Sequence, residues 1–489
     1  MAKLHQRQFQ EAEIDLKLVL LDAPNCVEAN MALARLLSES NRALFAQVHL
    51  ARAGLSGMTP KLALLFGANA RANTDVPAAV DWYRIAVEQN RESPEALAGL
   101  ALALDSKGDL AEADEIATQA ILKFPDNPEA RRVRAVVYGS MGDNAAADQT
   151  LSIRNLRPID LLDRGRYRDK LGRYDEAWND WARAKRLLRE VGGFQFNAAG
   201  FDRMVDDLGT MATKQRQATI GKVWPPPAIG GELAPMFVTG FPRSGTTMIE
   251  TAIACHSEVI AGDELPFINE LTQIAPALLG VLEPYPICMS AASYGENVTG
   301  LSILRDWYLR RALFRVSGGP AGTKFFTDKM PLNEIHIPLM LRLFPRSPIF
   351  YVRRHPLDIF VSNFSYHITH GWNYDCSLPS IAAAYVAIDA LLERYLKLFP
   401  RKVWTIKYEN FVADPAAELG KAFLHAGLSY EEGGVDFHNS ARYSRTISHK
   451  QIKEPLYDRS VGRWRNYQKF LAPVLEKVRP ICEREGYKL

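Results

Sequence analysis

The sequence lacks the features that mark secreted, membrane-spanning and nucleic-acid-binding proteins. Charged and amide side chains occur throughout its first twenty residues, so these residues form no apolar core of a signal peptide. No uncharged apolar run reaches the roughly 18 residues that a membrane span needs. Lysine and arginine number 59 against 56 for aspartate and glutamate, a net charge of +3, so the charge balance does not predict a nucleic acid partner. These absences predict a cytoplasmic protein without a membrane span.

Cysteine is scarce and follows no pattern. The five cysteines are odd in number and form no CxxC pair: Cys26, Cys255, Cys288, Cys376 and Cys482. Zinc sites and disulfide frameworks need paired or regularly spaced cysteines, so neither is expected. The ten histidines show no ligand spacing beyond His367 and His370, which we interpret as surface residues. The sequence therefore predicts no metal site.

The length of 489 residues exceeds that of one ordinary domain and predicts two or three folding units. Hydrophobic residues make up 47% of the chain and charged residues 24%. These fractions are typical of globular proteins and exclude collagen-like, disordered and coiled-coil classes.

Alanine recurs along the first part of the chain with a period near 34 residues. Successive in-phase alanines are separated by 34, 33, 34, 34 and 30 residues: Ala12, Ala46, Ala79, Ala113, Ala147 and Ala177. Four of them have a second alanine seven residues later, namely Ala53, Ala86, Ala120 and Ala184. Seven residues are two helical turns, so each pair lies on one helix face, where a neighbouring helix can approach closely.

This pattern resembles the tetratricopeptide repeat, a helix-turn-helix unit of about 34 residues, over residues 1–190. The fifth unit departs from it, because Arg154 stands where the second alanine belongs. The resemblance implies an N-terminal α-solenoid whose concave face docks a partner protein or peptide. An array that only braces the rest of the chain is the open alternative.

A change of composition separates the two halves of the chain. The run from Val223 to Gly231 contains three prolines and two glycines, which continue neither a helix nor a central strand. We therefore predict a linker over residues 191–232 and a second domain over residues 233–489.

The second domain opens with a phosphate-binding loop. A short buried strand is expected first, followed by Gly240-x4-Gly245-x-Thr247 and a helix. Such a loop points backbone N–H groups inward, and the helix presents its positive dipole end to an anion. Thr246 replaces the lysine that serves the β- and γ-phosphates of a nucleoside triphosphate. Arg243 supplies a cation from elsewhere in the loop, which suits a ligand with one 5′-phosphate bearing a transferable group.

A second signature follows a predicted strand over residues 349–353. This strand runs into Arg354, and Ser362 follows eight residues later. Pro356 suits the first turn of a helix, so Arg354 is expected at the strand's carboxyl end and Ser362 about two turns along the helix. Both side chains can then reach one phosphate, the arginine through a bidentate charged contact.

These two signatures, in this order, resemble the sulfotransferase superfamily. The resemblance implies a P-loop-like α/β domain with a central parallel sheet, which binds 3′-phosphoadenylyl sulfate (PAPS) as donor and releases adenosine 3′,5′-bisphosphate. It also implies a tyrosine that contacts the nucleotide after the strand beginning at Val403, and a closing loop marked by Trp464. The implied donor-binding residues are Arg243, Ser244, Gly245, Thr246, Thr247, Arg354, Ser362, Tyr408, Arg459 and Arg463.

The catalytic residues match the tyrosylprotein sulfotransferases better than the small-molecule branch. Small-molecule enzymes use a histidine in a Lys-x-His-x-Pro setting, and here Lys329 occupies the histidine's place. The tyrosylprotein enzymes use this lysine with a glutamate after the loop helix, which corresponds to Glu264. We assign Glu264 as the general base, with Asp263 as its rival, and Lys329 as the acid or electrostatic group at the bridging oxygen. Arg243 would stabilise the transferring group, and Ser448 would assist.

The sequence thus predicts sulfuryl transfer to a hydroxyl acceptor by in-line displacement, the acceptor being a protein tyrosine, a glycan or a small molecule. Fusion of the two modules is similar to bacterial proteins that join tetratricopeptide repeats to a sulfotransferase domain. Two alternatives stay open. One is a catalytically silent repeat scaffold. The other is a P-loop kinase, for which Thr246 and the pair of Arg354 and Ser362 are unsuitable.

Overall fold

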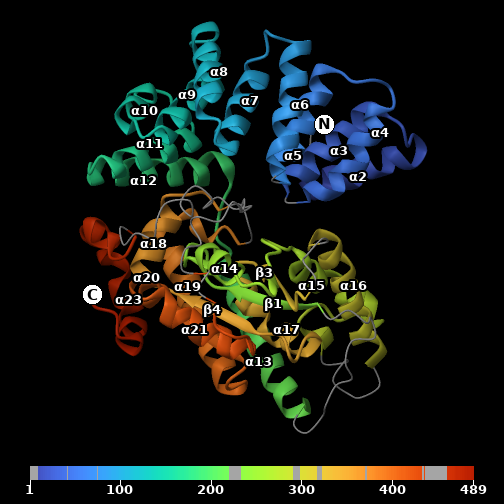
Figure 1. Ribbon diagram of the computed structural model, residues 1–489, viewed down its shortest axis with the longest axis vertical. Helices are drawn as coiled ribbons and strands as arrows, with labels where there is room; N and C mark the ends of the chain where they lie inside the picture. Colours follow the sequence, from blue (N-terminus) through green and yellow to red (C-terminus); the bar gives the residue numbers. More distant parts are fainter. Residues whose placement is uncertain are drawn as a thin grey trace. The chain divides into compact units, whose positions relative to one another are not determined.

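The computed structural model describes residues 9–40, 42–73, 75–219, 233–289, 298–316, 322–368, 372–431, 434 and 460–489. The chain divides into two units, Met1–Ala184 and Lys185–Leu489. The first unit is helical, and the second contains a parallel sheet with helices around it (Figure 1). The predicted fold class, a helical repeat array followed by an α/β domain with a parallel sheet, is confirmed.

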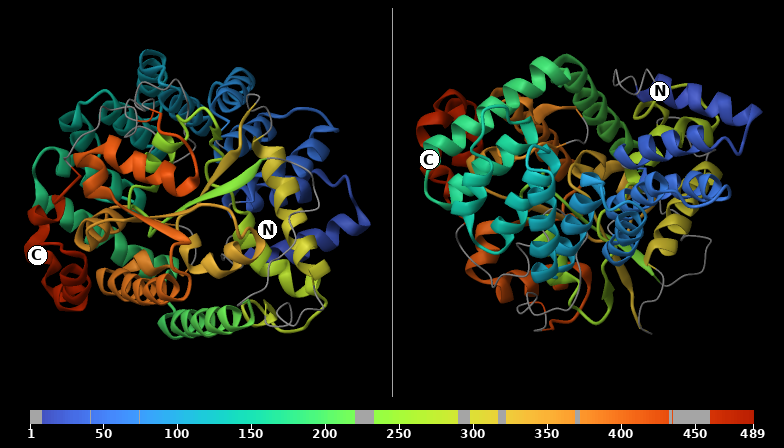
Figure 2. Two further views of the ribbon diagram at one scale, coloured as in Figure 1. Left: turned by 60° about the horizontal axis from the view of Figure 1, so that its bottom comes forward. Right: turned by 90° about the horizontal axis from the view of Figure 1, so that it is seen from above.

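Consecutive helices joined by short connections build the first unit. Figure 2 shows them following one another from blue to green. Because pairs of helices recur with the alanine period, the unit has the organisation of helix-turn-helix repeats. The helices are α2 (Phe9–Asp22), α3 (Val27–Glu39), α4 (Ala43–Gly54), α5 (Pro60–Ala72), α6 (Val76–Gln89), α7 (Pro94–Lys107), α8 (Leu110–Lys123), α9 (Pro128–Ser140), α10 (Asn144–Thr150), α11 (Pro158–Lys170) and α12 (Tyr174–Gly192). Helix α12 runs across the division, so its residues from Lys185 onward belong to the second unit.

The periodic alanines are buried between these helices. Ala12 is 3% exposed, and the five alanines in phase with it are fully buried. Their partners seven residues later are at most 1% exposed. Small side chains at these positions let neighbouring helices approach, which explains the sequence period. The fifth repeat, in which Arg154 replaces the second alanine, has a shortened helix, because α10 ends at Thr150 after 7 residues.

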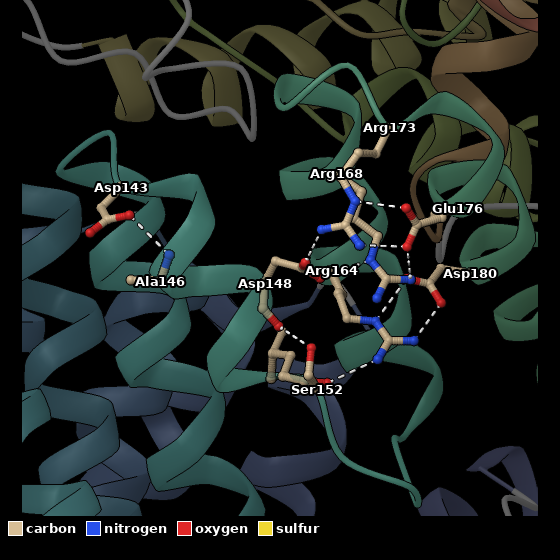
Figure 3. Close-up of polar contacts among 10 residues, drawn as sticks. Asp143, Ala146, Asp148, Ser152, Arg164, Arg168, Arg173, Glu176 and Asp180 are labelled. Carbon is tan, nitrogen blue, oxygen red and sulfur yellow. Dashed lines mark hydrogen bonds and ion pairs between the residues drawn. The ribbon is translucent and has the colours of Figure 1, made fainter.

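A cluster of mostly buried charged side chains lies among α10, α11 and α12 (Figure 3), and Arg173 is its more exposed member, with 42% of its side chain accessible. Arg164 donates to the two carboxylate oxygens of Asp180 at 2.8 and 2.6 Å. Arg168 donates to Asp148 at 2.8 Å and to Asp180 at 3.0 Å. Arg173 reaches Asp148 at 2.5 Å. Buried charges are tolerated only when paired, so this cluster fixes how the three helices pack.

The sheet of the second unit has the strand order β2, β3, β1, β4, β5 in the described residues, and all neighbouring strands are parallel. Val238 of β1, the central strand, pairs with Lys329 on one side and Phe350 on the other. The strands expected before the phosphate loop and at residues 349–353 are both present. The bounds are β1 (Ala234–Thr239), β2 (Val259–Ile260), β3 (Phe325–Lys329), β4 (Ile349–Arg353) and β5 (Val403–Lys407).

Helices lie on both sides of the sheet (Figure 2, left). Because side chains alternate along a strand, Val238 packs into a buried cluster with α14 (Thr246–Ile253) and α21 (Pro415–Ala426). Phe237 faces the other side and lies 6.2 Å from the ring of Tyr308 on α16. The other helices are α13 (Ala198–Thr219), α15 (Phe267–Leu279), α16 (Val298–Val316), α17 (Ile337–Leu343), α18 (Pro356–Phe364), α19 (Leu378–Leu398), α20 (Tyr408–Ala413) and α23 (Gln468–Glu485).

The linker predicted over residues 191–232 includes a helix and residues outside the described ranges. Helix α13 occupies part of it, and Thr213 of α13 accepts a hydrogen bond from Arg394 of α19 at 2.9 Å. The two units meet between Ala184 and Lys185, before the predicted linker. The proline- and glycine-rich run that suggested the linker belongs to residues 220–232, which lie outside the described residues. Nothing in the composition of residues 198–219 excludes a helix.

Candidate active site

The candidate site lies at the carboxyl ends of the strands. After β1 the chain forms β2 and β3 on one side, and then crosses β1 to form β4 and β5 on the other. The carboxyl ends of β1 and β4 therefore flank the point where the strand order reverses, which is where open α/β sheets bind ligands. The carboxyl end of each of these strands, or the segment after it, carries residues that the sequence singled out. Distant parts of the sequence are thus brought to one edge of the sheet.

The phosphate loop follows β1 and is closely packed. A Cβ atom on Gly240 would lie 2.6 Å from both the Val352 carbonyl oxygen and Ser244 Oγ, so only glycine fits there. Gly245 has φ +100°, and a Cβ atom on it would overlap the ring of Tyr408. Thr246 begins α14 directly after this glycine, as expected. The loop therefore ends at the amino end of a helix, with its backbone held close to β4 and α20.

The two arginines predicted to bind the donor lie together. Arg243 Nε donates to Ser362 Oγ at 3.0 Å. Arg354 Nη1 donates to the Arg243 carbonyl at 3.0 Å, and its guanidinium lies 4.6 Å from the centre of the Tyr408 ring. Arg354 also donates to the carbonyl of Ser460. The structure thus places Arg243, Arg354, Ser362 and Tyr408 in one cluster.

Two polar atoms of this cluster have no partner among the described residues. Ser244 Oγ and Arg354 Nε are both buried and form no hydrogen bond there. A buried donor or acceptor without a partner is costly in a folded protein. Both atoms are therefore suited to an anionic ligand that contacts the phosphate loop and the arginines.

Glu264 and Lys329 form an ion pair beside the loop. Lys329 is the last residue of β3, and its Nζ lies 2.7 Å from Glu264 Oε1. The Lys329 side chain is buried, whereas that of Glu264 is 34% exposed. Asp263, the rival base, is 8% exposed as a residue, and its carbonyl accepts a hydrogen bond from the Lys329 N–H at 3.0 Å. The Glu264 carboxylate thus contacts the lysine and is partly accessible.

A buried glutamate that the sequence analysis missed holds this pair in place. Glu250 of α14 accepts hydrogen bonds from Thr327 Oγ1 at 2.6 Å and from the Asp263 N–H at 3.0 Å. Thr327 Oγ1 accepts in turn from the Gly262 N–H at 3.0 Å. The segment that carries Glu264 is therefore tied to β3, which carries Lys329. A charged residue in an otherwise apolar helical stretch was the signal that could have found Glu250.

The carboxyl-terminal segment is anchored by Asp358, which the sequence analysis also missed. Its two carboxylate oxygens accept from the Gly462 N–H at 2.7 Å and the Trp464 N–H at 2.8 Å. These contacts flank Arg463 and fix its backbone next to α18. Arg459 and Ser448, the other residues predicted from this part of the sequence, lie outside the described residues.

Two further carboxyl groups near the strand ends are strongly buried. Burial raises the pKa of Asp328 to about 7, although a hydrogen bond from Tyr308 at 2.5 Å opposes the change. Burial also raises the pKa of Glu334 to about 7, against a hydrogen-bonded contact with Thr239 at 2.7 Å. Neither was predicted. Within the described part of the chain, no cluster of three or more histidine, cysteine, aspartate or glutamate side chains is arranged to hold a metal ion.

Residues 235–432 match the sequence model of the sulfotransferase family. The second unit therefore contains a sulfotransferase-family domain, as the two phosphate signatures predicted. None of the helices in the described ranges is long and apolar enough to span a membrane.

Similarity to individual proteins agrees with this domain. An uncharacterised protein from Aquifex aeolicus (strain VF5) is 30% identical over 261 residues, which cover 52% of this chain and 33% of that protein. The match thus spans a third of the length of this relative. Protein-tyrosine sulfotransferase 2 of Gallus gallus is 21% identical over 276 residues, covering 52% of this chain and 70% of the relative.

Another similar protein has a solved structure. A tetratricopeptide repeat protein from Parabacteroides merdae is 19% identical, with a TM-score of 0.35, and the match covers 37% of this chain and 73% of that one.

Proposed function

We propose that the second unit transfers a sulfuryl group from PAPS to a hydroxyl acceptor. The observation that carries the proposal is the 2.7 Å contact between Glu264 and Lys329 at the strand ends that also carry the phosphate loop. A carboxylate that can accept a proton and an ammonium that can stabilise a leaving phosphate are the two groups that this reaction needs.

The donor would lie along the phosphate loop and the arginine cluster. Ser244, Thr246 and Thr247 would face its 5′-phosphosulfate at the start of α14, and Arg354 with Ser362 would hold its 3′-phosphate. The buried, unpartnered atoms Ser244 Oγ and Arg354 Nε support this placement within the described residues. Gly245, Tyr408, Arg463 and Arg459 complete the proposed donor site. This donor has no triphosphate for a metal ion to bridge.

Transfer would be an in-line displacement. The acceptor oxygen attacks sulfur while the bond from sulfur to the bridging oxygen breaks, and its electron pair stays on the 5′-phosphate of adenosine 3′,5′-bisphosphate. Glu264 takes the proton that the acceptor loses. Lys329 stabilises the charge on the leaving phosphate and Arg243 that on the transferring group. Ser448 keeps its proposed assisting role.

The assignment of the base is tested by comparing Glu264→Gln with Asp263→Asn in the full chain. We expect Glu264→Gln to lower transfer of labelled sulfate from PAPS by about 100-fold or more, because general bases contribute about 10² to 10⁴ in rate. The affinity for adenosine 3′,5′-bisphosphate should change little. Asp263→Asn should keep more transfer than Glu264→Gln. The reverse order would make Asp263 the base.

Only the similarity to a relative favours one class of acceptor over the others. The likeness to a protein-tyrosine sulfotransferase favours a protein hydroxyl over a glycan or a small molecule. We propose that the repeat array docks this protein or a partner that brings it. Incubating a cell lysate with labelled PAPS and the full chain, followed by fractionation, would show which fraction carries the label. Label in small metabolites alone would contradict a protein acceptor.

Tighter binding of ATP than of adenosine 3′,5′-bisphosphate would favour the kinase alternative.

A further inference from the structure

The segment Tyr366–Ile368, which follows α18, is held by a buried ion pair. Lys185 of α12 is 1% exposed in its side chain, and its Nζ lies 2.7 Å from Asp375 Oδ2. The same ammonium donates to the Tyr366 carbonyl. Asp375 Oδ2 accepts from the Ile368 N–H at 2.9 Å and lies 3.3 Å from His367 Nδ1. One pair of charges therefore fixes three consecutive residues.

Burial acts on both members of this pair. It lowers the pKa of Lys185, and the charge of Asp375 opposes that change. Burial favours the neutral carboxyl group, but the hydrogen bond from His367 and the charge of Lys185 keep the pKa of Asp375 below its usual value. A buried ion pair adds little to stability compared with apolar side chains of similar size. It does fix geometry, because the ammonium must meet both the carboxylate and the Tyr366 carbonyl. This geometry points to a positioning role.

The fixed segment contacts the donor site through Tyr366. The guanidinium of Arg243 lies 4.5 Å from the centre of the Tyr366 ring. Arg243 also donates to Ser362 at 3.0 Å. Arginine has many rotamers, and a side chain held before its ligand arrives loses less entropy on binding. The ring therefore helps to keep Arg243 in the orientation that reaches Ser362.

We propose that Lys185 and Asp375 are positioning residues of the donor site, which act by holding the Tyr366 ring against Arg243. This inference rests on the proposed function, since it concerns how Arg243 meets PAPS. Lys185 precedes residues 235–432, the region that matches the sulfotransferase family. Part of the support for the donor site thus comes from a helix outside the family domain.

The test is binding of adenosine 3′,5′-bisphosphate to the full chain, measured by calorimetry. Tyr366→Leu removes the ring but keeps the ion pair. Lys185→Met removes the hydrogen bond to the Tyr366 carbonyl. We expect each variant to bind roughly 3- to 30-fold more weakly, the range that corresponds to a cation–π contact. In an Arg243→Met background both losses should nearly vanish, because the residues act through Arg243.

Arg189→Met is the matched control. Arg189 lies on the same helix as Lys185 and donates to the Cys376 carbonyl at 2.5 Å rather than to the Tyr366–Ile368 segment. The Arg189→Met variant should therefore bind adenosine 3′,5′-bisphosphate as tightly as the unsubstituted chain does. If Tyr366→Leu and Lys185→Met lowered the affinity equally with Arg243 present and in the Arg243→Met background, their role would be merely structural and the proposal would be overturned. If Lys185→Met fails to fold, an unchanged affinity of Tyr366→Leu would still overturn it. Absence of binding by the unsubstituted chain would overturn the proposed function and this inference with it.

Discussion

Arg243 and Asp263 share an unusual backbone conformation at the site. Their φ angles are +73° and +59°, a region that residues with side chains seldom occupy. Such strain persists only where the surrounding structure enforces it, and it concentrates at functional sites. Here the two residues lie in the phosphate loop and immediately before the proposed base. The strained backbone therefore coincides with the two segments whose positions the chemistry requires.

The buried carboxyl group of Glu334 shares the Thr239 hydroxyl with a backbone carbonyl. Thr239 Oγ1 lies 3.0 Å from the Met330 carbonyl and 2.7 Å from Glu334 Oε2, yet the hydroxyl has one hydrogen to donate. The hydroxyl is therefore shared between the two oxygens and only partly offsets the burial that raises the pKa of Glu334 to about 7.

Glu334→Gln should therefore reduce the pH dependence of stability. A carboxyl group whose folded pKa is raised from its ordinary 4.5 to about 7 stabilises the fold fully below pH 4.5, and this contribution is lost as the pH rises through 7. The shift corresponds to roughly 3 kcal/mol at most. Urea unfolding at pH 5.5 and pH 8 should show a smaller loss of stability for Glu334→Gln than for the unsubstituted chain. Asp328, with its own raised pKa, retains part of the dependence. An unchanged difference between the two pH values would contradict the raised pKa.

At the scale of helices and strands, sequence patterns predicted the features that depend on residues close together in the chain. The alanine period predicted the stacking of repeat helices. Two alanines seven residues apart place small side chains on one face of a helix, where a neighbouring helix can pack. The phosphate loop and the pair of Arg354 and Ser362 were likewise contained in short segments. Glu250 and Asp358 could not be placed this way. Their partners lie 77 and 106 residues away in sequence, and only the fold brings them together.

Packing of α10, α11 and α12 should depend on Asp180. This carboxylate pairs with Arg164 at 2.6 Å and Arg168 at 3.0 Å, and it is 6% exposed. Asp180→Ala removes the carboxylate partner of Arg164 and one of the carboxylate partners of Arg168. It should lower the free energy of unfolding of the repeat unit by about 3 to 5 kcal/mol. Urea unfolding of the full chain measures the change.

Glu39→Ala is the matched control in the same unit. It removes an ion pair with Arg35 whose side chains are 50% and 66% exposed. An exposed pair of this kind contributes about 1 kcal/mol or less. Similar effects of the two substitutions would show that the buried cluster does not hold the three helices together.

At the scale of the whole molecule, the near-neutral charge conceals a local concentration of cations. The net charge of +3 gave no sign of an anionic ligand. Arg243 and Arg354 nevertheless lie in one cluster, and Lys329 lies beside the same phosphate loop. Each unit also has its own buried hydrophobic clusters. A ligand of the second unit should therefore stabilise that unit directly.

Thermal unfolding of the full chain in the presence of adenosine 3′,5′-bisphosphate tests this expectation. At a ligand concentration of about 100 times Kd, the unit that binds it gains about 2.7 kcal/mol. Its unfolding temperature should rise by several degrees. Asp180→Ala identifies the transition of the repeat unit, because it should lower that transition and leave the ligand-induced rise unchanged. If the ligand instead raised the transition that Asp180→Ala lowers, the anion site would belong to the repeats, and the assignment of Arg243, Arg354 and Ser362 to donor binding would be wrong.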